Sequence, residues 1–141
     1  MIKKIDHIGI AVKSIEHSLP FYTDILNLTF EGIEDVSTEN VKVAFIKIGE
    51  SKLELLQPLT EDCTIARFIA RHGEGIHHIA LCVDSIKARI QDMKNNGIKM
   101  IHDEAKLGAN GAEIAFIHPK STGNVLYEFC HKKNQGGHLN D

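Results

Sequence analysis

The chain has 141 residues, of which 43% are hydrophobic and 25% charged, and its formal net charge is −3. This length and composition fit one soluble domain with a sizeable core. Because basic and acidic residues are interspersed, the charge pattern excludes a basic footprint for nucleic acid or for an acidic membrane. No apolar run reaches the length of a membrane span, and the N-terminal residues lack the pattern of a signal peptide.

The three cysteines, Cys63, Cys82 and Cys130, are widely spaced and contain no CxxC pair. An odd, scattered set argues against a disulfide framework and fits a reducing compartment, so we expect a cytoplasmic protein. The cysteines themselves are expected to be small core residues rather than ligands or nucleophiles.

The sequence repeats itself after about half its length. Asp6–Ile15 aligns with His77–Ile86, which places His7 and His78 at equivalent points 71 residues apart. Each copy begins with a short strand and continues, after a serine suited to an N-cap, into a helix. The two helices are expected at 15–26 and 86–96.

A proline and a glycine mark where helices should bend or end. Pro20 lies inside the first helix, so we expect a kink or a short first turn there. A connector helix between the halves should be capped by Thr64 and end at Gly73.

Strand-like segments follow the helix of each half. The strands are expected at 28–35, 41–48 and 51–57 in the first half, and at 98–102, 112–118 and 124–131 in the second.

Each half therefore predicts the order β-α-β-β-β, and the whole chain an α+β fold. Because one such unit cannot bury both faces of its sheet, two units side by side should form an open, curved, mixed sheet. The helices would lie outside, and the inner face would form a cup for a ligand. We expect one domain over residues 1–141: module one at 1–60, a connector at 61–73, module two at 74–132, and a disordered tail at 133–141.

Strand alternation places one histidine of each copy inside the cup. His7 shares its face with Gly9 and Ala11, and His78 shares its face with Ala80. A face of one histidine among small residues packs a core poorly and leaves open volume. The opposite face is expected to pack against the helices; it carries Ile8, Ile10, Val12, Ile79, Leu81 and Val83.

A carboxylate occupies the last strand of each half, Glu54 in the first and Glu128 in the second. Each alone could face solvent on the wet side of a sheet. Repeated at equivalent positions, two His and two Glu form a mixed imidazole and carboxylate set that suits Zn, Co, Ni, Mn or Fe. We expect one divalent ion there, with Co, Ni, Zn and Mn as the candidates. Without thiolates, the site should keep positions open for substrate oxygens.

Several segments carry a resemblance to a known family. Over residues 4–131 the chain resembles the vicinal oxygen chelate superfamily, and within it the methylmalonyl-CoA epimerase family. The HH pair, the KLG loop and the HPK turn are more specific than the His and Glu residues alone. The matching segments are Asp6–Val12, Leu53–Leu59, Gly75–Ala80, Lys106–Gly108, His118–Lys120 and Gly123–Glu128.

The resemblance implies His7, Glu54, His78 and Glu128 as metal ligands. It implies epimerisation at C2 of methylmalonyl-CoA through a metal-stabilised thioester enolate, with Glu128 as a catalytic base. It also implies an acyl-CoA substrate and a homodimer.

One departure from the family leaves the second proton donor open. Some members place a further catalytic Glu on the strand that spans 41–48 here, where this chain has Val43 and Ala44. Glu39 lies just upstream. The donor is therefore Glu39, a metal-bound water or another group.

Other functions in the same superfamily compete with the epimerase. Glyoxalase I, a lactoylglutathione lyase acting on a glutathione hemithioacetal, uses the same four ligands, although the KLG and HPK segments favour the epimerase. A non-catalytic binding member would be expected to lack a ligand. A dioxygenase normally keeps two His and one Glu, against which Glu54 argues. Of the other histidines, His77 should face away from the cup, either as a packing residue or as a residue that contacts a metal ligand, and His118 should lie at the surface or the rim.

Overall fold

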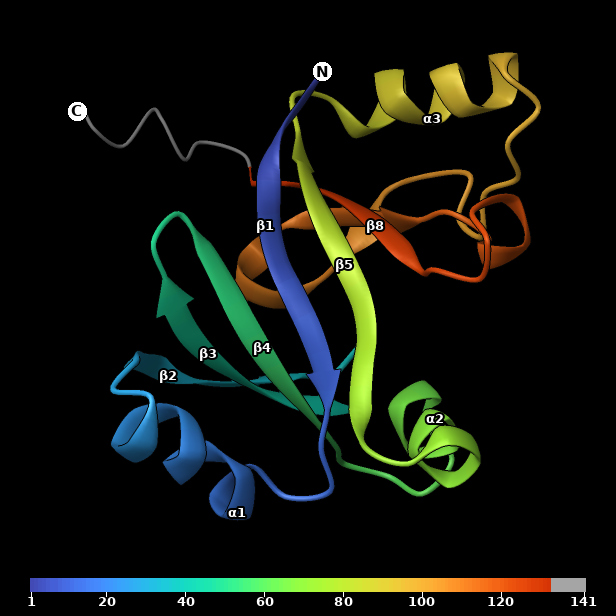
Figure 1. Ribbon diagram of the computed structural model, residues 1–141. Helices are drawn as coiled ribbons and strands as arrows, with labels where there is room; N and C mark the ends of the chain where they lie inside the picture. The colour runs from blue at the N-terminus through green and yellow to red at the C-terminus, as the bar shows by residue number, and fades with distance from the viewer. Residues whose placement is uncertain (133–141) are drawn as a thin grey trace.

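Eight strands form one mixed sheet in the computed structural model, which describes residues 1–132 (Figure 1). Our expectation for the tail 133–141 lies outside the described residues. The strand order is β2-β3-β4-β1-β5-β8-β7-β6. The strands are β1 (Ile2–Ala11), β2 (Thr29–Val36), β3 (Val41–Ile48), β4 (Ser51–Pro58), β5 (Gly75–Val83), β6 (Lys106–Leu107), β7 (Glu113–Phe116) and β8 (Tyr127–His131).

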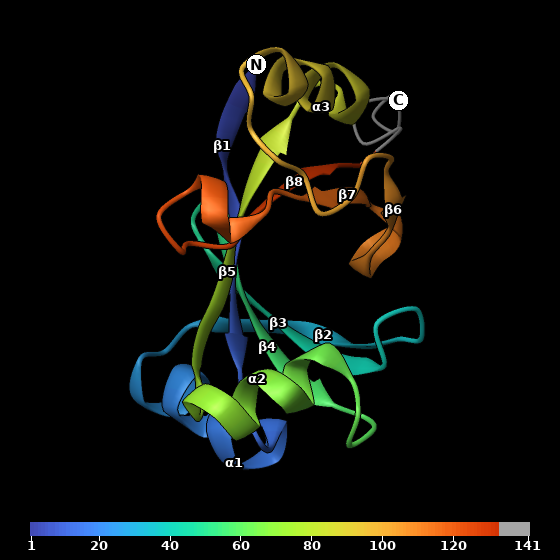
Figure 2. The same ribbon diagram turned by 90° about the vertical axis from the view of Figure 1, so that its right-hand side faces the viewer.

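The sheet is made of two halves that meet along β1 and β5. Within each half the first strand is parallel to the last, β1 to β4 and β5 to β8, whereas β1 and β5 are antiparallel to each other. Figure 2 shows β2, β3 and β4 at one end of the molecule and β6, β7 and β8 at the other, with β1 and β5 running through both. The predicted α+β fold of two joined modules with a mixed sheet is confirmed.

The helices follow the expected serine caps. Ser14 accepts a hydrogen bond from the backbone N–H of His17 at 3.2 Å and starts α1 (Ile15–Pro20). Ser85 does the same for Ala88 at 3.1 Å and starts α3 (Ile86–Asn95). Beyond α1 the chain widens into a π-helical turn, η1 (Phe21–Ile25), because proline has no N–H to donate to the preceding turn. The 15–26 helix is thus divided at Pro20.

The connector helix α2 (Thr64–His72) ends at Gly73 with φ 79°, as predicted. Its N-cap is Cys63 and not Thr64, which is the first helical residue, so the predicted side-chain cap was wrong. α2 packs on the inner face of the sheet, where Cys63 and Ile65 join the apolar cluster of Ala11 and Leu56. No helix within residues 1–132 is long and apolar enough to cross a membrane.

The outer face has two separate cores. One packs under α1 around Ile15 and Ile46, and the other packs under α3 around Ile86 and Phe129. Because α1 and α3 lie at opposite ends of the sheet (Figure 1), the middle of β1 and β5 has no helix over it. Val12, Val83 and Ile10 join these cores as expected, whereas Ile8, Ile79 and Leu81 are only half-buried.

The second module is shorter at its edge than the sequence predicted. The expected strand 98–102 is reduced to a single bridge between Met100 and Ile117, and the edge strand is instead the two-residue β6. Asp103 and Glu104, which follow the segment, are exposed and polar, so no strand continues there.

Candidate metal centre

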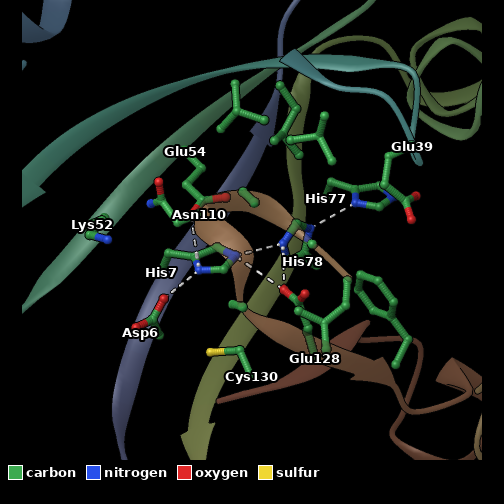
Figure 3. A pocket seen from close by; sticks show the side chains of 18 of the residues that line it. Asp6, His7, Glu39, Lys52, Glu54, His77, His78, Asn110, Glu128 and Cys130 are labelled. Carbon is green, nitrogen blue, oxygen red and sulfur yellow. Dashed lines mark hydrogen bonds and ion pairs between the residues drawn. The ribbon is translucent and has the colours of Figure 1, made fainter. Parts of the chain in front are cut away.

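The cup is a cavity of about 330 Å³ lined by both halves of the chain. All four predicted ligands line it and are buried: His7 on β1, Glu54 on β4, His78 on β5 and Glu128 on β8. These four strands are neighbours at the centre of the sheet. Figure 3 shows the side chains of the four residues turned toward one another.

The small residues beside the histidines make room for the histidine of the other half. Gly9 pairs with His78 across β1 and β5, and Ala80 pairs with His7. A Cβ built on Gly9 would lie 2.3 Å from Cε1 of His78, a distance that carbon atoms do not tolerate. The open volume expected from the sequence is therefore filled by an imidazole from the neighbouring strand.

Three ligand atoms converge on one point. Nε2 of His7 lies 3.1 Å from Nε2 of His78, and Oε1 of Glu128 lies 3.2 Å from both. Oε1 of Glu128 is buried without an oriented hydrogen-bond donor. Buried acceptor atoms that face one another need a cation between them, either a proton or a metal ion. The donor set of two imidazoles and a carboxylate fits a divalent transition metal.

Glu54 stands to one side of this point. Its Oε2 lies 3.3 Å from Nδ1 of His7, on the far side of that ring from Nε2. Burial raises the pKa of Glu54, and the charge of His7 opposes the rise. The structure thus groups three of the predicted ligands and leaves Glu54 beside them, so Glu54 as a fourth ligand stays a prediction.

The charges within the cluster are strongly coupled. Burial alone would lower the pKa of His7, but contacts with Asp6, Glu128 and Glu54 raise it to about 10. Burial alone would raise the pKa of Glu128, yet the two imidazoles lower it to about 2. In the metal-free protein a proton on His7 therefore supplies the positive charge that the carboxylates require.

Two residues at the site differ from what the sequence predicted. His77 was expected to face away from the cup, but its Nδ1 lies 3.0 Å from Nδ1 of His78. Asp6 was not singled out, yet its Oδ2 lies 2.8 Å from Nδ1 of His7. Burial, and to a smaller extent the charge of His78, lowers the pKa of His77 to about 4. Each of the two residues is the extra residue of a bulge in the ladder between β1 and β5, which redirects its side chain, and strand alternation alone cannot reveal this.

Glu39, named as a possible proton donor, does line the cavity. It forms an ion pair with Lys106, which joins the turn after β2 to β6. Val43 also lines the cavity and contributes an apolar side chain to its wall. Burial raises the pKa of the Cys130 thiol, which fits a core residue. His118 accepts a hydrogen bond from the backbone of Lys120 at 3.1 Å at a turn.

Residues 6–116 match the Glyoxalase/Bleomycin resistance protein/Dioxygenase superfamily, and the chain belongs to that superfamily. Within it, the sequence groups with the methylmalonyl-CoA epimerases. The chain is 36% identical over 126 residues to the mitochondrial methylmalonyl-CoA epimerase of Mus musculus, with 89% of this chain and 71% of that protein covered. It is 35% identical to the ethylmalonyl-CoA/methylmalonyl-CoA epimerase of Cereibacter sphaeroides, with 91% of this chain and 97% of that protein covered.

Solved structures give the same grouping. A methylmalonyl-CoA epimerase in complex with methylmalonyl-CoA and NH4+ superimposes with a TM-score of 0.90 at 32% identity, covering 94% of this chain and 96% of that one. A hypothetical protein from Bacillus halodurans C-125 has a TM-score of 0.92 and 58% identity, with the same two coverages of 94% and 96%.

Proposed function

We propose that the protein catalyses metal-dependent epimerisation at C2 of methylmalonyl-CoA through a thioester enolate. The observation that supports this most strongly is the convergence of the Nε2 atoms of His7 and His78 with Oε1 of Glu128 inside the cup. The similarity to methylmalonyl-CoA epimerases in sequence and fold supports the substrate class.

His7, His78, Glu128 and Glu54 would hold one divalent ion, with Co, Ni, Zn and Mn as the candidates. When bound, the ion supplies Lewis-acid stabilisation of the negative charge that develops on the thioester oxygen. The apolar walls of the cavity, among them Val43, Leu56 and Ile114, exclude water from the reacting carbon.

Glu128 would accept the α-proton from one face of the substrate carbon. Glu128 lies on β8, which has β5 on one side and β7 on the other, and its side chain is buried. A second group must return a proton on the opposite face. Glu39 is one carboxylate that the cavity offers on a different element, and its pairing with Lys106 holds it at the cavity wall.

The reaction assay separates this function from its nearest competitor. Protein loaded with Co²⁺ or Ni²⁺ should exchange the α-proton of methylmalonyl-CoA for deuterium in D₂O, as followed by NMR. The same protein should leave the methylglyoxal–glutathione adduct unchanged. Turnover of the adduct without exchange of the thioester would assign a lactoylglutathione lyase and refute the epimerase.

Replacing the proposed base tests the role of Glu128. Glu128→Gln removes both the proton acceptor and a metal ligand, so we expect a loss of exchange of at least ~100-fold, the scale of one general base. Metal retention through gel filtration should also fall. Glu61→Gln makes the same chemical change at an exposed position and should leave both unchanged. Near-normal turnover of Glu128→Gln would remove Glu128 from the mechanism.

We also propose that the protein is a cytoplasmic homodimer. The uncovered middle of β1 and β5 presents an apolar strip on the outer face that supports self-association. Ile5 is 45% exposed and Ile76 is 62% exposed, and Ile8, Ile79 and Leu81 beside them are half-buried.

A further inference from the structure

Each ligand histidine holds its second ring nitrogen against the residue that precedes it in the chain. Nδ1 of His7 lies 2.8 Å from Oδ2 of Asp6, and Nδ1 of His78 lies 3.0 Å from Nδ1 of His77 (Figure 3). Consecutive residues of a regular strand point to opposite faces. Neither contact would therefore form if β1 and β5 were regular throughout.

A β-bulge at Asp6 makes the first contact possible. In the ladder between β1 and β5, Ile5 pairs with Leu81 and His7 pairs with Ala80. Asp6 is thus an extra residue on β1 that has no partner in the ladder. A bulge bends the strand and redirects the side chain, which here brings the carboxylate to the imidazole of the next residue.

A second bulge does the same for His77. Gly9 pairs with His78 and Ile10 pairs with Ile76, so His77 is the extra residue on β5. The alignment of the two halves matches this residue with the extra residue of β1, so the device occurs once in each module.

The two contacts decide where the ring protons lie. An ionised Asp6 can only accept, so His7 donates from Nδ1 and keeps the Nε2 lone pair for the cluster. For His78 to present its Nε2 lone pair in the same way, it must carry its proton on Nδ1. That proton is then donated to Nδ1 of His77, whose own proton lies on Nε2.

We propose that Asp6 and His77 are positioning residues, which fix the ring tautomers of His7 and His78 and direct both Nε2 atoms at the metal ion. The inference rests on the proposed metal site. A hydrogen bond to the outer nitrogen of a ligand histidine orients the ring and makes it a stronger donor to the metal. Because Asp6 is a charged acceptor and His77 a neutral one, the effect is larger on His7 than on His78.

Metal affinity tests the role of His77. His77→Phe removes the acceptor but keeps a ring against Phe68, whose centroid lies 4.9 Å from that of His77. In competition with a chelator, Zn²⁺ affinity should fall by about 10–100-fold. His77→Asn keeps an oxygen that can accept, and should bind Zn²⁺ within a few-fold of the wild type. His72→Phe is the matched control, because His72 also contacts Phe68, at 4.9 Å, from an exposed position on α2.

The same competition with a chelator tests the role of Asp6 in the first module. Asp6→Leu should lower Zn²⁺ affinity more than His77→Phe does. Asp6→Asn keeps an acceptor oxygen without the charge, and should lie between Asp6→Leu and the wild type.

A spectroscopic readout distinguishes positioning from a general loss of stability. In the zinc-loaded wild type, nitrogen NMR of the imidazoles should show both His7 and His78 protonated on Nδ1. The Nδ1 proton signal of His78 should move in His77→Phe and not in His72→Phe. Because the tautomers are measured in the wild type, this part holds even if a variant fails to fold.

The outcomes separate this inference from the proposed function. A wild type that binds zinc with His78 unprotonated on Nδ1, or a His77→Phe variant with unchanged affinity, overturns the positioning role alone. A wild type that binds no divalent metal overturns the metal site as well.

Discussion

Gly9 is where β1 comes closest to the imidazole of the neighbouring strand. Its backbone conformation is open to any residue, so its requirement is steric: a methyl group there would overlap the ring of His78. We expect Gly9→Ala to destabilise the protein by about 1–3 kcal/mol, the usual result of overpacking, and to weaken metal binding because the ring must move. Chemical denaturation and a zinc titration measure the two effects.

Gly108→Ala provides the comparison for Gly9→Ala. A Cβ at Gly108 would lie 3.0 Å from Cγ2 of Ile114, a side chain that can shift. Its loss of stability should be the smaller of the two. An equal loss at both positions would contradict a specific clash at Gly9.

The raised pKa of His7 links the stability of the metal-free protein to pH. A group whose folded pKa, about 10 here, exceeds its unfolded value of 6.5 stabilises the fold fully below pH 6.5. This stabilisation is lost as pH rises toward 10. We expect the urea midpoint of the metal-free protein to fall between pH 6.5 and 9, before the buried thiol of Cys130 adds its own dependence. His7→Asn should flatten the profile, and an unchanged slope in that variant would assign it to other groups.

At the same scale, the sequence identified the four acidic and histidine residues but not the contacts between them. The repeat located His7, His78, Glu54 and Glu128, because their positions follow from the alignment of the halves. Strand alternation placed His77 on the opposite face, so its contact with His78 could not be found in this way. One inserted residue in a ladder reverses the alternation on which the prediction depended, and no local residue pattern announced it.

Among the elements, the strands that follow the first helix were predicted better than the β6 edge of the second module. β3 and β4 match their expected ranges closely, since each has a partner on both sides. The segment 98–102 has the apolar residues of a strand, yet β7 is only four residues long, and the segment forms one bridge, with Ile117 just beyond the end of β7. Whether an apolar segment becomes a strand depends on its neighbour, and that information lies elsewhere in the chain.

The four proposed ligands come from the four strands at the centre of the sheet, β4, β1, β5 and β8. A bound ion would link these strands side by side, so metal should suppress their local opening. We expect hydrogen exchange to slow in these four strands on addition of zinc, with much smaller changes in β2, β6 and α3. His7→Asn should lose the response. Uniform slowing over the whole chain would instead indicate general stabilisation.

For the whole molecule, the apolar outer strip predicts the state of association. Sedimentation equilibrium should show a dimer for the wild type. The double variant Ile5→Lys, Ile76→Lys places charges on the strip and should be monomeric, while zinc affinity is retained because both side chains are exposed and neither lines the cavity. Ile33→Lys, at an exposed site that is 50% accessible on β2, is the control and should remain dimeric. A monomeric wild type would refute the homodimer.

The reciprocal pairing of Gly9 with His78 and of Ala80 with His7 has a consequence for how the duplicated halves can change. Neither half contains the space that its own histidine occupies. A substitution that enlarges Gly9 harms the second copy, and one that enlarges Ala80 harms the first. A larger residue at either position therefore requires a compensating change in the other half of the chain.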